Sequence, residues 1–173
     1  AIITNAGGPG VLITDAAIRE GLLLAQFEEE TTATLKRSLP TTANIKNPVD
    51  VIGDARADRY VAAISAALKD KNVDGIFVIL TPQSMTDIES IATEITRVAS
   101  QYEKPVYTSF MGQADVAEGI KILEHSDIPH YVLPESMCKP FFTVFHFNRH
   151  IKKSKAAFLE STHSVKKEAF QLL

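Results

Sequence analysis

The chain has 173 residues, of which 45% are hydrophobic and 23% are charged, and its formal net charge is −3. This size suffices for one globular domain with its own core, and the slight acidic excess argues against a nucleic-acid partner. The apolar runs are shorter than the about 20 residues that a membrane-spanning helix needs, so we expect no membrane partner. The single cysteine, Cys138, agrees with a reducing compartment, and we expect the protein in the cytoplasm.

Short apolar runs alternate with helical patterns along the chain. The runs predict strands over 1–4, 22–27, 48–52, 75–80, 105–111 and 130–134. Helices are predicted near 10–20, 31–38, 56–70, 84–101 and 114–125, and from about 135 onward. Strands that are apolar on both faces belong in a parallel sheet with helices on each side. The alternation therefore predicts a doubly wound α/β fold, flavodoxin-like or Rossmann-like, in one domain over 1–150. Residues 151–173 are predicted to form a linker or tail helix.

Four loops between a predicted strand and the next helix contain glycine and small polar residues. They are NAGGPG (5–10), GDAR (53–56), TPQSMT (81–86) and MGQAD (111–115). In a parallel sheet such loops gather at the carboxyl edge, where helix N-termini offer free N–H groups to an anion. Each loop could equally serve only as a turn and a cap, with Thr81 or Ser84 capping one helix and Asp54 another. Four such helix starts on one rim favour an anion-binding edge.

The glycine-rich loop fits none of the common phosphate-binding motifs. A dinucleotide fingerprint that begins at Gly8 would place Ile13 where Gly or Ala is needed, and a P-loop needs a lysine, of which the first is Lys36. A phospho-accepting receiver domain would need an acidic pair after the first strand to hold Mg²⁺, and a flavin carrier would need hydroxyl residues there. Pro9 presets a helical φ, so we expect the loop to begin a helix abruptly with bare backbone at its tip.

Four stretches resemble, in order and spacing, one domain of the NDP-forming acyl-CoA synthetases. They are IITNAGGPGVLITDA, LPTTANIKNPVDVIGDARADRY, VDGIFVILTPQSMTD and SFMGQADVAEGIKILEHSDIPHYVLPE, within residues 1–145. The same stretches are similar to the carboxy-terminal part of the succinyl-CoA synthetase β-subunit. The resemblance implies a flavodoxin-like domain of a larger enzyme. That enzyme converts acyl-CoA, ADP and phosphate into acid, CoA and ATP through a phosphohistidine.

The resemblance also implies how this domain takes part. It would bind no cofactor itself, whereas the full-length protein would use CoA, ADP or ATP, and Mg²⁺. Its partners would be the CoA-binding, phosphohistidine-bearing and ATP-grasp domains or subunits. The N-terminus of its first helix would stabilise the phosphohistidine through bare N–H groups at Gly7, Gly8 and Gly10. The residues implied at that phosphate site are Asn5, Ala6, Gly7, Gly8, Gly10 and Val11. Those implied near the acid substrate are Thr81, Gln83 and Ser84, with Asp50, Gly53 and Asp54 in support.

No stretch of the chain matches the family's phosphohistidine segment, and the chain begins in a predicted strand without Met. We therefore expect a segment of a longer protein that is inactive by itself. His146 and His150 have a spacing that could suit a metal, but no third ligand is nearby, so no metal site is predicted. Two alternatives stay open: a regulatory synthetase-like module of a protein lysine acetyltransferase, and a free-standing, non-catalytic binding module.

Overall fold

A computed structural model describes residues 1–112 and 114–151 of the chain. It consists of two compact units, Ala1–Cys138 and Lys139–Leu173. Residues 138–151 are helical, whereas the rest of the predicted tail helix over 151–173 lies outside the described residues. Within the second unit, the rings of Phe142 and His146 lie 4.1 Å apart between centroids. The domain boundary expected after residue 150 stays a prediction.

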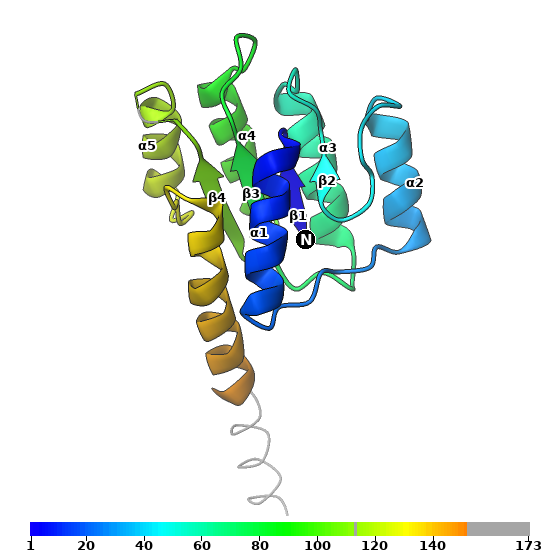
Figure 1. Ribbon diagram of the computed structural model, residues 1–173, viewed down its shortest axis with the longest axis vertical. Coiled ribbons are helices and arrows are strands. Elements are labelled where there is room, and N and C mark those ends of the chain that lie inside the picture. The colour runs from blue at the N-terminus through cyan, green and yellow to red at the C-terminus, as the bar shows by residue number, and fades with distance from the viewer. Residues whose placement is uncertain (113, 152–173) are drawn as a thin grey trace, which may run out of the picture. The chain divides into compact units, whose positions relative to one another are not determined.

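The first unit is built on a parallel sheet with the strand order β2-β1-β3-β4 (Figure 1). The strands are β1 (Ile2–Thr4), β2 (Val49–Asp50), β3 (Ile76–Leu80) and β4 (Val106–Phe110). In place of the predicted strand over 130–134, His130 forms one parallel bridge with Thr108 at the outer edge of β4. The sheet thus has the order of a flavodoxin-like fold, whose fifth position is reduced to a single bridge. The prediction of a doubly wound, flavodoxin-like α/β domain is confirmed.

Helices cover both faces of this sheet (Figure 1). Four of them pack side by side on one face: α2 (Glu29–Ser38), α3 (Ala57–Lys69), α4 (Ile88–Ala99) and α5 (Ala117–His125). Helix α1 (Gly7–Arg19) lies on the opposite face, where it contacts the short 3-10 helix η1 (Pro134–Met137). None of the helices among the described residues has the length and apolar character that crossing a membrane would require.

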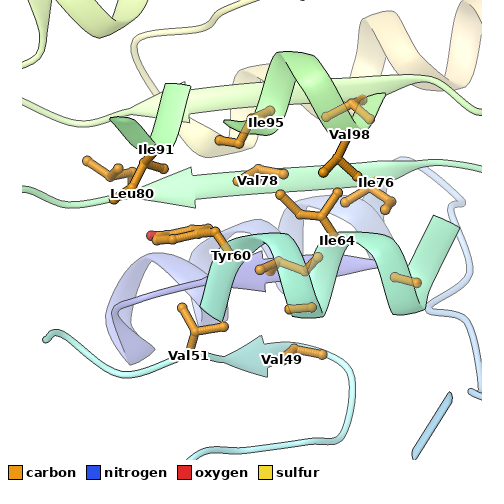
Figure 2. Packing of buried hydrophobic residues seen from close by; sticks show 14 of the residues in the cluster. Val49, Val51, Tyr60, Ile64, Ile76, Val78, Leu80, Ile91, Ile95 and Val98 are labelled. Carbon is orange, nitrogen blue, oxygen red and sulfur yellow. The ribbon is translucent and has the colours of Figure 1, made fainter. Parts of the chain in front are cut away.

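The main core fills the space between the sheet and the helices α3 and α4 (Figure 2). Alternate side chains of β3 face this layer, because successive residues of a strand point to opposite faces. Tyr60 of α3 is fully buried there, and its hydroxyl donates to the carbonyl oxygen of Ile79 at 3.1 Å. Burial, together with the nearby carboxylate of Asp50, raises the pKa of Tyr60 well above its ordinary value. The phenol is therefore a neutral donor that ties α3 to β3.

The predicted strand over 22–27 is wrong. This segment is an extended connection between α1 and α2 that pairs with no strand. The side-chain amide of Asn47 donates to the carbonyl oxygen of Ala25 at 3.1 Å, in place of a neighbouring strand. The side chain of Leu23 is 94% exposed, so the apolar run is not a buried strand. Side chains can satisfy backbone hydrogen-bonding groups in place of a neighbouring strand. The amino-acid composition of a segment does not reveal which of the two partners it has.

Candidate functional site

The loops after β1 and β3 are joined by a side chain at the carboxyl edge of the sheet. The Nδ2 of Asn5 donates to the carbonyl oxygen of Thr81 at 2.8 Å. In return, the backbone N–H and the hydroxyl of Thr81 donate to Oδ1 of Asn5 at 2.8 and 3.0 Å. Asn5 is only 3% exposed. Strands β1 and β3 flank the switch point at which flavodoxin-like folds bind their ligands. The amide of Asn5 is thus engaged within the fold, in a positioning role.

Helix α1 begins beside this amide, with Ala6 as its N-cap and no side-chain cap. The N–H of Gly10 donates to the carbonyl oxygen of Ala6 at 3.3 Å, so the prediction that this N–H is bare is wrong. Val11 lies one residue further into the helix, where N–H groups bond within the helix itself. The N–H groups of Gly7 and Gly8 have no acceptor among the described residues. The tip of α1 therefore presents two free donors.

The N-terminus of α1 differs electrostatically from those of the helices α2 to α5. Each of the helices α2 to α5 has an acidic side chain in its first turn: Glu29 and Glu30 in α2, Asp58 in α3, Glu89 in α4 and Glu118 in α5. Helix α1 has none. A helix N-terminus has a partial positive charge that such side chains offset. The sequence predicted four anion-attracting helix starts at this rim, whereas the structure has one, at α1, without its own carboxylate in the first turn.

The glycines of this loop serve two different purposes. A Cβ atom on Gly10 would approach Cγ2 of the buried Thr4 to 3.1 Å, so Gly10 allows α1 to pack closely on β1. A Cβ atom on Gly8 would meet nothing within 4 Å, and neither Gly7 nor Gly8 has a positive φ. The fold itself therefore does not require glycine at position 8. The missing side chain leaves open space outside the domain.

The loop after β2 brings a third segment to the same place. Ile52 has a φ of 72°, a left-handed conformation that is costly for a β-branched residue. The carboxylate of Asp50 stabilises this turn, because its Oδ1 accepts from the N–H of Ile52 at 2.9 Å. The turn places Gly53 so that its Cβ position lies 3.8 Å from the carbonyl oxygen of Asn5 and 3.7 Å from Cγ of Gln83. Asp50 and Gly53 thus support the loops at the edge.

Asp54 does not cap a helix, contrary to the prediction. Helix α3 begins at Ala57 with Arg56 as its N-cap, and no side chain caps it. The carboxylate of Asp54 instead pairs with the guanidinium of Arg59, at 2.5 Å from its Nη1. The hydrogen bond from Arg59 lowers the pKa of Asp54. Asp54 therefore holds Arg59, whose Nη1 also reaches the carbonyl oxygen of Val51 at 3.2 Å.

The loop after β3 is longer than predicted, since α4 begins at Ile88 and not near residue 84. The N-cap is Asp87, whose carboxylate accepts from the N–H of Ser90 at 3.1 Å, which excludes the alternative that Thr81 or Ser84 caps this helix. Gln83 and Ser84 lie exposed in this loop. The side-chain amide of Gln83 has no hydrogen-bond partner among the described residues and is free for a ligand.

Two features of the site were not found in the sequence. The bond between Asn5 and Thr81 has no local signal, because the two residues are 76 positions apart. The left-handed Ile52 has none either, since β-branched residues normally predict extended backbone. Within residues 1–112 and 114–151, no three side chains of the kinds that bind metals lie together.

A comparison with known protein families identifies the family of this chain. The family model described as "Ligase-CoA domain" matches residues 1–151. The chain belongs to the Ligase-CoA domain family.

Relatives of this Ligase-CoA domain are parts of larger proteins. The chain is 40% identical over 134 residues to the ADP-forming acetate–CoA ligase I of Archaeoglobus fulgidus, with 78% of this chain and 19% of that protein covered. It is 38% identical over 175 residues to the ADP-forming acetate–CoA ligase of Methanocaldococcus jannaschii, with 99% and 25% covered. The chain thus spans about a fifth to a quarter of the length of these relatives.

The structure of the Ligase-CoA domain is also similar to solved structures. One is the dinucleotide-forming acetyl-coenzyme A synthetase 1 of Ca. Korarchaeum cryptofilum, in complex with phosphate and ADP. The TM-score is 0.78 at 29% sequence identity, and the match covers 86% of this chain and 32% of that chain.

Proposed function

We propose that this Ligase-CoA domain is one part of an ADP-forming acyl-CoA synthetase. In that enzyme it presents the N-terminus of α1 to a phosphohistidine on another domain or subunit. The whole enzyme would convert acyl-CoA, ADP and phosphate into acid, CoA and ATP. The observation that supports this role is the bare start of α1, with free N–H groups at Gly7 and Gly8, no cap and no acidic residue in the first turn. A phosphoryl group is the kind of anion that such a helix end attracts.

In phosphoryl transfer, this domain would need only to position the phosphoryl group and to stabilise its charge. Phosphoryl transfer depends on holding the group in line and stabilising the charge on its equatorial oxygens. The two N–H groups of α1 can donate to those oxygens, and the open space above Gly8 admits the other domain. The Oδ2 of Asp50 lies 3.9 Å from the Cβ position of Gly7. This negative charge would repel the phosphoryl group from that side and direct it toward Gly8.

The acid substrate would meet the loop after β3. The N–H and hydroxyl of Thr81 are already bonded to Asn5, so Thr81 would position the loop. The exposed amide of Gln83 and the hydroxyl of Ser84 are the groups that we propose for binding the acid. Gly53 supports Gln83, since its Cβ position lies 3.7 Å from Cγ of Gln83.

Other parts of the synthetase would hold the remaining ligands. CoA, ADP and Mg²⁺ would bind on the CoA-binding and ATP-grasp domains or subunits, and the phosphohistidine would lie on a further one. We infer a cytoplasmic enzyme, in agreement with the buried, unpaired Cys138. The chain by itself would catalyse nothing. The names of the relatives, which are ligases, favour a synthetase over a regulatory module of an acetyltransferase.

The test is phosphate transfer to the histidine in the full-length protein. Gly8→Asp would place a carboxylate against the phosphoryl group, whereas Gly8→Asn has nearly the same shape without the charge. Both should fold, because the position is open and has no positive φ. Losing such donors typically costs a hundred- to thousandfold in rate, so labelling of the histidine by radioactive phosphate should fall by about that much in Gly8→Asp, and less in Gly8→Asn. A well-folded Gly8→Asp variant that labels at the parent rate would overturn the proposal.

A further inference from the structure

Helix α1 presents two exposed apolar side chains next to its free N–H groups. Val11 is 61% exposed and Leu12 is 54% exposed. They follow Gly8 by three and four residues, so they lie on the same helix face as Gly8. Side chains of a helix lean toward its N-terminus, which brings these two beside the open space above Gly8. A domain that brings a group to the N–H of Gly8 would therefore also come close to Val11 and Leu12.

This face is unlike a helix start that faces water. The helices α2 to α5 have acidic side chains in the first turn, as described above. On α1, the first charged side chain after Gly8 is Asp15, almost two turns further on. Single exposed apolar residues are common on protein surfaces and need no explanation. Here, however, two of them adjoin free N–H donors at a helix end without charged side chains of its own, as expected of a surface that another part of the protein covers.

We infer that Val11 and Leu12 form a water-excluding contact with the phosphohistidine-bearing domain of the synthetase. This inference rests on the proposed function and assigns these side chains a task that the N–H groups cannot perform. With the carrier domain seated, the apolar pair closes the space around the phosphoryl group. Exclusion of water strengthens the hydrogen bonds from α1 and prevents hydrolysis. In that side reaction, a water oxygen attacks phosphorus, the P–N bond breaks, inorganic phosphate leaves and the imidazole nitrogen takes up a proton.

The carrier domain is the occupant that the position of the pair favours. The pair shares one helix face with the free donors at Gly8, so a surface that covers one also covers the other. The matched relatives extend well beyond the length of this chain, so a synthetase of that kind would have further domains to cover it. A second copy of the chain would instead bring a second bare helix end, of the same partial charge, toward the first.

The lifetime of the phosphohistidine tests this inference. The histidine of the full-length protein is labelled with radioactive phosphate, and the loss of label is followed without ADP. Val11→Ser and Leu12→Ser should each shorten the half-life, and the double variant should shorten it several-fold. Ile18→Ser is the matched control, because Ile18 is an apolar residue of the same helix, 59% exposed, ten residues beyond Gly8. Ten residues correspond to about 15 Å along the helix axis, so this variant should keep the parent half-life.

The conservative variant Leu12→Met should keep the long half-life, because it preserves apolar contact. Equal half-lives in the parent and the double Ser variant would overturn the inference, as would an equal loss in Ile18→Ser. The Gly8→Asp experiment separates the two proposals. Blocked labelling in Gly8→Asp with an unchanged half-life in the Ser variants would contradict only the water-excluding contact. Normal labelling in Gly8→Asp would contradict the proposed function itself.

Discussion

Asn5 and Thr81 bind each other through three hydrogen bonds of 2.8 to 3.0 Å, although they are 76 residues apart. The contact fixes the residue before the N-cap of α1 against the first residue after β3. It thereby fixes the loop that contains Gln83 relative to the free N–H donors of α1. In the proposed enzyme, the phosphate and acid sites would therefore have a fixed mutual position.

Removal of this contact should destabilise the domain strongly. Asn5→Ala leaves the N–H and carbonyl of Thr81 without partners, and an unsatisfied buried polar group costs about 1–3 kcal/mol. Thr81→Val is the matched variant, since it removes only the hydroxyl hydrogen bond and should cost about 0.5–1.5 kcal/mol. Urea unfolding of the chain measures both. An Asn5→Ala variant no less stable than Thr81→Val would show that water replaces the amide without loss.

The two kinds of glycine in α1 should respond oppositely to alanine. Gly8→Ala adds a methyl group in open space and should leave the free energy of unfolding unchanged or raise it by up to about 1 kcal/mol. Gly10→Ala presses on Thr4, which is buried and whose Oγ1 accepts from the N–H of Ala6 at 3.1 Å. Because Thr4 cannot easily give way, we expect a loss of about 1–3 kcal/mol. Thermal unfolding of both variants decides this, and equal melting temperatures would contradict the packing role of Gly10.

The start of α4 can be located by its cap. Asp87→Ala removes the side-chain acceptor for the N–H of Ser90 and should cost about 0.5–2 kcal/mol. Ser84→Ala changes a residue in the loop before the helix and should leave the free energy of unfolding unchanged. Chemical denaturation compares the two. A larger loss in Ser84→Ala would mean that the helix begins near residue 84, as the sequence pattern predicted.

The stability of the domain should depend on pH through His130. The Nε2 of its ring accepts from the N–H of Phe110 at 3.2 Å, which requires the neutral ring. Burial lowers the pKa of His130 below its ordinary value, so the unfolded chain takes up the proton first as the pH falls. The stabilisation is therefore complete above about pH 6.5, the ordinary value for histidine, and is lost as the pH falls through the lower pKa of the folded state.

Urea midpoints between about pH 7.5 and pH 5 measure this dependence, over the range in which histidine ordinarily titrates. His130→Asn should be less stable at pH 7.5 and should largely lack the decline toward pH 5. The exposed His125 provides the control, because His125→Asn should keep the decline. If His130→Asn retains the full decline, other groups are responsible for it.

Gln83 can be separated from the phosphate site by its kinetics. In the full-length protein, Gln83→Ala should raise the KM for the acid while phosphorylation of the histidine from ATP continues near the parent rate. The reason is that Gln83 lies exposed in the loop after β3, with its side-chain carbons against the Gly53 region. Steady-state kinetics with varied acid, and labelling with ATP alone, provide the two readouts. Equal losses in both would place Gln83 outside acid binding.

The sequence by itself determined the kind of fold, and it predicted where a site would lie. Buried strands and amphipathic helices have periods that are visible in the residues, so the parallel, flavodoxin-like sheet could be predicted. The glycines and Pro9 marked the start of α1, because backbone freedom and a preset φ are properties of single residues. The motifs around these residues also indicated the family.

Only the tertiary structure decided which groups of the site are free. The N–H of Gly10 is used within α1, whereas those of Gly7 and Gly8 are not, and the amide of Asn5 is occupied by Thr81. The segment over 22–27 has the composition of a strand, yet the carbonyl groups of Ala25 and Gln26 accept from the side chains of Asn47 and Asn72. Hydrogen-bond partners and open space depend on atoms that packing brings together across the chain. Local periodicity contains no information about them.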